Sequence, residues 1–116
     1  MSCYEKRYTL DQRRSEARRV LHKFSDRVPI IVKENDPKQT KLDKKKYLVP
    51  RDLTIGQFIY VLRKRMKFPP EKALFCFVGK ILPTTSSMIG TSYDSFKSKD
   101  DFLYITVSCE NTFGSN

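Results

Sequence analysis

Side chains that commonly do chemistry are few in this sequence and lie far apart. The single histidine, His22, lies in a basic stretch, and Cys3, Cys76 and Cys109 lack the paired spacing that builds zinc sites or disulfide frameworks. Nucleophilic catalysis needs a Cys/His or Ser/His/Asp arrangement, and acid–base hydrolysis needs paired carboxylates. No such arrangement stands out. We therefore expect neither an enzyme nor a metal site, and we expect reduced thiols in a cytosolic setting.

Basic side chains are the second chemically informative feature. Lysine and arginine number 23 against 13 acidic residues, which gives a net charge of +10. Residues 41–67 alone hold nine basic side chains against Asp43 and Asp52. Such a surface attracts nucleic acid, anionic lipid headgroups or acidic peptides, because all three gain Coulomb energy from it. Charge alone does not choose among these partners.

The length and hydropathy of the chain limit its organisation. A chain of 116 residues with 39% hydrophobic residues has room for one core and is too short for two ordinary domains. No segment approaches the ~18 apolar residues typical of a membrane-spanning helix. Any membrane attachment would therefore come from charge, from an amphipathic surface or from a covalent lipid.

An amphipathic helix is predicted near the N-terminus. Thr9 and Gln12 have the spacing of a capping box, in which each side chain accepts a hydrogen bond from the backbone of the other residue. The helix should end near residues 25–26. Its expected apolar stripe is narrow and consists of Leu10, Ala17, Leu21 and Phe24. We interpret this helix as a layer added to the core.

The rest of the chain predicts a mixed sheet crossed by a helix. Apolar runs predict strands at residues 28–32, 46–50, 73–78 and 102–109, with a polar loop at 33–45. A second capping box, Thr54 to Gln57, opens a helix that must stop before Pro69, and residues 92–96 allow a short helical turn.

This order predicts an α+β fold of the β-grasp type, in which a central helix crosses a mixed four-stranded sheet. We expect a helical extension at residues 1–27, the β-grasp domain at 28–109 and a flexible tail at 110–116.

Five sequence segments resemble one known family in both order and spacing. They are Lys46–Pro50, Asp52–Arg65, Pro69–Ala73, Asp101–Tyr104 and Glu110–Gly114. Over nearly its full length the chain is similar to the ubiquitin-like autophagy modifiers, the family of GABARAP and the microtubule-associated light chains. Tyr47 and the Glu110–Gly114 ending look closer to the GABARAP branch.

The resemblance implies that this protein is a modifier conjugated through its tail. A dedicated cysteine protease would cut between Gly114 and Ser115, and activating and conjugating enzymes would carry the new carboxylate to phosphatidylethanolamine. Phe113 would anchor the tail, and Gly114, which lacks a Cβ, leaves its carbonyl open to attack. No cofactor is expected beyond this covalent lipid. The protein would be cytoplasmic, and after lipidation it would lie on autophagosome, vacuole or lysosome membranes.

The same resemblance implies a peptide-binding edge at residues 46–50. A strand at a sheet edge can pair with an extended peptide, and the family binds cargo receptors through aromatic-x-x-aliphatic motifs in this way. The implied aromatic pocket consists of Glu16, Val20, Pro29, Ile31, Lys46, Leu48 and Phe102. The implied aliphatic pocket consists of Tyr47, Val49, Pro50, Leu53, Phe58, Val61 and Leu62. The basic residues expected to meet an acidic flank are Arg27, Lys44, Lys46 and Arg65.

Several alternatives stay open at this point. Leu53, Phe58 and Leu62 have the spacing of ordinary core residues. Phe75 and Phe77, which the family would use to dock its protease and conjugation machinery, can also be core. The resemblance also implies a microtubule contact, although the short N-terminal lead, residues 1–4, departs from the family. The chain as a whole could instead be an adaptor that is never conjugated, or a basic nucleic-acid-binding domain; we expect no nucleic acid as partner.

Overall fold

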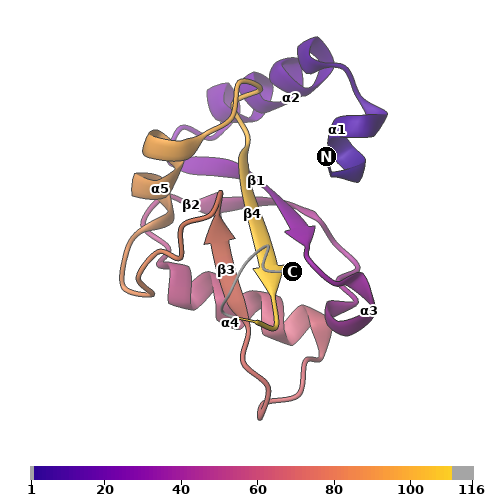
Figure 1. Cartoon of the computed structure of the whole chain (residues 1–116). Helices are drawn as coiled ribbons and strands as arrows, with labels where there is room; N and C mark the ends of the chain where they lie inside the picture. Colours follow the sequence, from indigo (N-terminus) through magenta and orange to yellow (C-terminus); the bar gives the residue numbers. More distant parts are fainter. Residues whose placement is uncertain (1, 111–116) are drawn as a thin grey trace.

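The computed structural model describes residues 2–110 of the chain, and these residues build four strands and five helices around one mixed sheet (Figure 1). The strands are β1 (Arg27–Glu34), β2 (Lys46–Pro50), β3 (Phe75–Val78) and β4 (Leu103–Ser108). The helices are α1 (Cys3–Arg7), α2 (Leu10–Lys23), α3 (Pro37–Thr40), α4 (Ile55–Met66) and α5 (Ile89–Phe96).

The sheet has the strand order β2-β1-β4-β3. Strand β1 pairs antiparallel with β2 and parallel with β4, and β3 pairs antiparallel with β4. Strands β2 and β3 are therefore the two edges of the sheet. This arrangement confirms the predicted α+β fold with a mixed four-stranded sheet.

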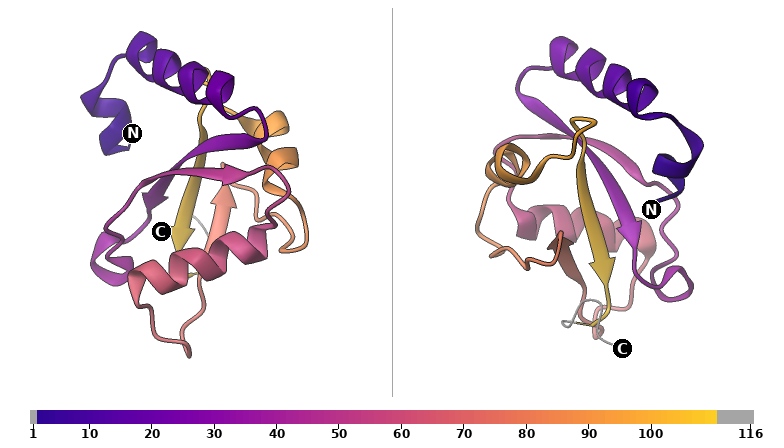
Figure 2. Two further views of the ribbon diagram at one scale, coloured as in Figure 1. Left: turned by 180° about the vertical axis from the view of Figure 1, so that it is seen from behind. Right: turned by 45° about the horizontal axis from the view of Figure 1, so that its top comes forward.

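Helices α4 and α2 cover opposite faces of the sheet (Figure 2). Ile30 belongs to the large core cluster under α4, together with Phe58 and Leu62. Its neighbour Ile31 belongs to a smaller cluster with Ala17 of α2 and Phe102. Because successive side chains of a strand point to opposite faces, β1 separates the two layers. The predicted N-terminal helical layer is thus confirmed.

The predicted starts of α2 and α4 are correct, and some predicted ends and faces are not. Capping boxes open α2 at Thr9 and α4 at Thr54, as expected. Helix α2 ends at Lys23, slightly before the predicted end, and two members of its predicted apolar stripe do not pack inward: Leu10 is 36% exposed and Phe24 37% exposed. Ala17 alone is fully buried on this helix, so α2 docks by a smaller apolar contact than predicted.

Other boundaries also differ from the sequence-based expectation. Helix α5 starts at Ile89 instead of residue 92, and β3 starts at Phe75 instead of residue 73. Strand β1 extends to Arg27 and Glu34, and the polar loop that follows contains the short helix α3. Among residues 2–110, no helix has the length and apolar character to cross a bilayer.

Candidate functional site

The outer edge of β2 offers backbone groups for pairing. In the β1–β2 register Ile30 lies opposite Tyr47, and the Val32 N–H donates to the Lys45 carbonyl at 2.7 Å in the same register. In an antiparallel pair the bonded positions alternate with positions whose backbone groups point away. The N–H and C=O groups of Lys46 and Leu48 therefore face outward, where an added strand can bond to them.

A pocket of about 210 Å³ opens beside this edge, between α2 and the sheet. Its walls come from α2, β1, β2, the loop before β2 and the residue that precedes β4. They consist of Glu16, Val20, Pro29, Lys44, Lys46, Tyr47, Leu48 and Phe102. Six of the seven residues predicted for an aromatic pocket are therefore brought together here. The seventh, Ile31, is only 1% exposed and packs with Phe102 beneath the surface.

Charged groups surround the mouth of this pocket. Glu16 pairs with Arg19 at 2.9 Å and with Lys46 at 3.4 Å. The hydrogen bond from Arg19 and the nearby Lys46 charge outweigh partial burial and lower the pKa of Glu16. Lys46 also lies 5.4 Å from the Tyr4 ring centroid, and Lys44 lies 5.1 Å from that of Tyr47. An ionised Glu16 thus holds Lys46 at the pocket. A charged group of a ligand can replace either partner in this ion pair.

The predicted aliphatic pocket lies partly in the core. Phe58 and Leu62 are 0% exposed and belong to the main cluster, and the Phe58 ring packs edge-on against Tyr47. Tyr47 and Val49 are also buried, while Pro50 and Leu53 are half-buried and Val61 is 39% exposed. The core interpretation therefore holds for Phe58 and Leu62. Of the seven predicted residues, all within the described part of the chain, Pro50, Leu53 and Val61 are the accessible ones.

The basic residues predicted for an acidic flank are all on the surface. Arg27, Lys44 and Lys46 are exposed, and Arg65 lies at the surface in a 3.4 Å ion pair with Asp43. An acidic peptide would compete with this exposed pair, which water already screens.

Phe75 and Phe77, predicted as a docking pair, lie on one face of β3 but differ in exposure. Phe75 is half-buried beside Ser108, and Phe77 is 3% exposed beside Thr106. A surface that uses this pair would therefore present mainly Phe75. The predicted tail residues Phe113, Gly114 and Ser115 lie outside the described residues.

One site-building residue, Asp100, was missed by the sequence analysis. Its buried carboxylate accepts from Arg13 Nη1 at 2.7 Å, from the Tyr104 hydroxyl at 2.5 Å and from the Phe102 N–H at 2.9 Å. Burial and then the bond to Asp100 raise the pKa of Tyr104. Asp100 thereby ties α2 to the backbone that carries Phe102, a wall of the pocket. No local pattern links Asp100 to Arg13, because 87 residues separate them.

The described residues also bear on metal binding and on thiol chemistry. Among residues 2–110, no group of three or more His, Cys, Asp or Glu side chains could hold a metal ion. Cys76 is buried, and burial raises the pKa of its thiol to about 12, which keeps it protonated and inert.

Known proteins match the chain over nearly its whole length. The family model described as "Autophagy protein Atg8 ubiquitin like" matches residues 12–114. Autophagy-related protein 8 of Schizosaccharomyces pombe is 49% identical over 115 residues, which cover 98% of this chain and 95% of that protein.

Solved structures agree with this match. Trypanosoma brucei ATG8 superposes with a TM-score of 0.88 at 39% identity, covering 98% of this chain and 99% of that one. Plasmodium falciparum Atg8 in complex with a Plasmodium falciparum Atg3 peptide has a TM-score of 0.87 at 24% identity, covers 97% of this chain and 100% of that one, and shows the shared fold alone. The expected closeness to the GABARAP branch stays a prediction. The chain belongs to the Atg8 family, the ubiquitin-like, lipid-conjugated modifiers of autophagy, and it is not an enzyme.

Proposed function

We propose that this chain is conjugated through Gly114 to phosphatidylethanolamine on autophagosomal membranes, where it recruits cargo receptors and autophagy factors that carry aromatic-x-x-aliphatic motifs. The observation that carries the recruitment role is the pocket beside the outward backbone groups of Lys46 and Leu48. A built pocket next to an open strand edge is the arrangement that binds an extended peptide.

The geometry also supports one direction for the peptide. The pocket wide enough for an aromatic side chain lies at the Lys46–Leu48 end of β2, and the apolar surface of Pro50, Leu53 and Val61 lies toward its other end. Residues three apart on a strand are separated by ~10 Å. A peptide parallel to β2 can therefore place its aromatic residue in the pocket and its aliphatic residue on the second surface.

The conjugation role rests on the family and on the tail. A processing cysteine protease would free Gly114, and activating and conjugating enzymes would transfer it to the lipid. The Atg3 peptide bound to Plasmodium falciparum Atg8 supports a partner from the conjugation pathway. Phe75, half-buried on β3, is the accessible member of the predicted docking pair. The protein would be cytoplasmic before conjugation and membrane-bound on autophagosome, vacuole or lysosome afterwards. A microtubule contact stays a prediction.

The test is the intact mass of the protein recovered from the cytosolic and membrane fractions of its own cells. We expect a soluble form that ends at Gly114 and a membrane form heavier by one phospholipid. The Gly114→Ala variant should lose the membrane form, whereas Ser115→Ala should keep it. If both fractions retain residues 115–116 and Gly114→Ala keeps its localisation, the chain is a peptide-binding adaptor that is never conjugated.

A further inference from the structure

A second hollow, separate from the peptide pocket, lies where α4 ends. It has a volume of about 390 Å³ and shares no lining residue with the pocket at β2. The last turns of α4 and the following turn supply its walls, which are Tyr60, Arg63, Lys64, Phe68 and Pro70. We call it the α4 hollow. The Tyr60 side chain is 59% exposed at this hollow.

Two cations of the α4 hollow are held against aromatic rings. Lys64 Nζ lies 4.9 Å from the Tyr60 ring centroid, and Arg63 Cζ lies 5.4 Å from that of Phe68. Arg63 Nη2 donates to the Lys72 carbonyl, whereas Arg63 Nη1 is covered and has no acceptor among residues 2–110. A covered donor without an acceptor is unfavourable. A ligand oxygen that enters beside the ring after a small shift of the guanidinium would supply one.

The charge around the α4 hollow is predominantly positive. Between positions 63 and 72 the acidic residue is Glu71, and the same segment contains the basic residues Arg63, Lys64, Lys67 and Lys72. Within residues 2–110, none of these four basic side chains forms an ion pair. Cations at a helix C-terminus are expected from the helix dipole. The dipole does not require an exposed tyrosine and proline beside them. The combination of phosphate-binding cations with an amphipathic ring is typical of a membrane interface.

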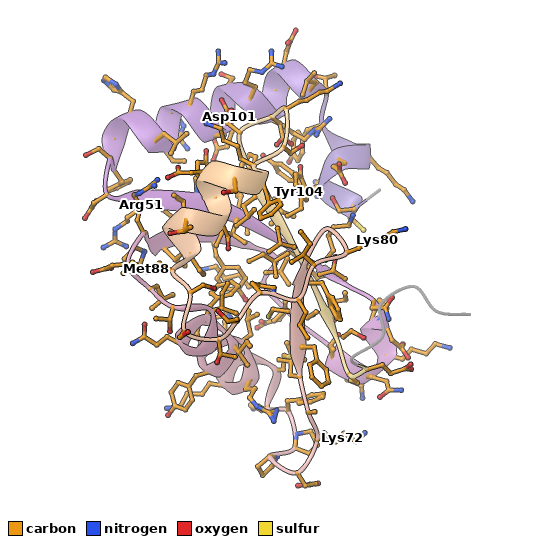
Figure 3. All side chains as sticks on the ribbon, turned by 60° about the vertical axis from the view of Figure 1, so that its left-hand side comes forward. Arg51, Lys72, Lys80, Met88, Asp101 and Tyr104 are labelled. Carbon is orange, nitrogen blue, oxygen red and sulfur yellow. The ribbon has the colours of Figure 1, made fainter. Side chains whose placement is uncertain are left out.

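The α4 hollow also lies near the point where the chain leaves the sheet. Ser108, at the end of β4, pairs with Phe75, and Phe75 follows Lys72 by only three residues. Lys72 lies on a turn that projects beyond the sheet (Figure 3). Six residues separate Ser108 from Gly114, and a fully extended chain of that length spans at most ~20 Å. A lipid on Gly114 would therefore hold this end of the molecule at the bilayer.

We propose that the α4 hollow is a second membrane contact, in which Arg63 and Lys64 bind the phosphate of an anionic phospholipid headgroup and Tyr60 lies at the interface. The proposal rests on the proposed conjugation at Gly114 for its biological role, because the tail brings the hollow to the bilayer. The affinity itself belongs to the folded chain and does not require conjugation. Each basic side chain near an anionic surface contributes about fivefold to the partition coefficient, or about 1 kcal/mol.

The experiment uses the unconjugated full chain, which contains no tryptophan, so Tyr60→Trp introduces a single tryptophan, which can be excited selectively, in the hollow. The probes are phosphatidylcholine vesicles with and without about 30% phosphatidylserine at low salt. We expect a blue shift of the tryptophan emission of this variant only with the anionic vesicles, and quenching when the lipid tails are brominated. Phe96→Trp, at a residue 47% exposed on α5, should show neither change.

Charge reversal identifies which surface binds. Lys64→Glu with Lys72→Glu should lower vesicle partitioning about tenfold or more. Lys6→Glu with Lys23→Glu, on α1 and α2, changes the net charge equally and should preserve most of it. An equal loss in both pairs would show diffuse attraction and overturn the proposal.

Emission from the Tyr60→Trp variant that responds to a glutamate-rich peptide but not to vesicles would also overturn the proposal and assign the hollow to acidic peptides. Loss of the membrane form in Gly114→Ala cells tests conjugation separately, since the vesicle assay does not involve Gly114.

Discussion

Asp100 shows how one buried carboxylate positions a binding site. Its side chain is 0% exposed and that of its partner Arg13 is 11% exposed, so this ion pair is largely removed from water. Removing one member of a buried ion pair lowers stability by more than the intact pair contributes, because the other charge stays buried without a partner. Surface pairs such as Arg14–Asp11, whose Asp11 side chain is 95% exposed, contribute little by comparison.

We therefore expect Asp100→Asn to lower the free energy of unfolding by about 3 kcal/mol, measured by urea denaturation. Asp11→Asn is the matched control and should cost less than about 0.5 kcal/mol. Because Asp100 also holds the backbone of Phe102, peptide affinity should fall in Asp100→Asn and stay unchanged in Asp11→Asn. Equal stability of the two variants would mean that α2 docks through its apolar contacts alone.

Glu34 is a second buried carboxylate, with a side chain only 4% exposed. Burial by itself raises the pKa of a carboxyl group. At Glu34 the opposing effect is larger: the Leu42 N–H, the Thr40 hydroxyl and Lys45 all donate to it and lower its pKa below the ordinary 4.5. The loop after β1 is thus closed around an ionised side chain.

A lowered folded-state pKa makes stability depend on pH in one direction. The contribution of ionised Glu34 is fully present above the unfolded-state pKa and disappears as pH falls through the lower folded-state value. We expect Glu34→Gln to flatten the decline in the free energy of unfolding between about pH 5 and about pH 3, followed by urea denaturation. Glu71→Gln, at an exposed side chain, should retain the wild-type decline. A wild-type decline in Glu34→Gln as well would contradict the role of these hydrogen bonds.

At the scale of elements, prediction succeeded where a local physical signal was strong. The capping boxes at Thr9 and Thr54 marked two helix starts, since each satisfies backbone donors within a single turn. The run at residues 46–50 matches β2. Six of the seven aromatic-pocket residues came from family resemblance, because they lie on α2, β1, β2 and the residue before β4, which no local pattern connects.

Elements without a strong local signal were missed or shortened. Helix α1 has its own capping box, Ser2 with Glu5, but five residues are too few to show an apolar period. Helix α3 spans four residues in a polar loop and has a single buried residue, Thr40. The start of α5 contains Gly90, a poor helix former. Gly90 is required there because a Cβ would lie 2.9 Å from Arg51, a long-range contact that the sequence does not reveal.

The orientation of β2 yields a test of strand addition. Leu48 contributes both an outward N–H and a side chain in the pocket wall. Leu48→Ala removes the side chain only, whereas Leu48→Pro removes the N–H as well and leaves the ladder with β1 intact. We expect the proline variant to bind an aromatic-x-x-aliphatic peptide about fivefold more weakly than the alanine variant, measured by calorimetry. Equal affinities in two folded variants would show that the peptide does not bond to this edge.

For the whole molecule, the fold keeps the two proposed binding surfaces apart. The peptide pocket lies between α2 and the sheet, and the α4 hollow lies at the end of the helix on the opposite face. If the tail holds the α4 end at the membrane, the pocket and the β2 edge stay accessible to partners from the cytoplasm. Positive charge lies at both surfaces, because Lys44 and Lys46 line the pocket and Arg63 and Lys64 line the hollow.

The net charge of +10 should act on the rate of peptide association. Long-range attraction accelerates the encounter with an acidic peptide and is screened by salt, while the short-range contacts in the pocket control dissociation. A motif peptide with an acidic flank should associate about tenfold faster at about 0.02 M than at about 0.5 M salt, with a nearly constant dissociation rate. A peptide with the same motif and a neutral flank should change less than about twofold. Because the chain has no tryptophan, a tryptophan at the aromatic position of the peptide reports binding in stopped-flow experiments. A salt effect confined to the dissociation rate would place the flank in the bound interface and contradict steering by the surface charge.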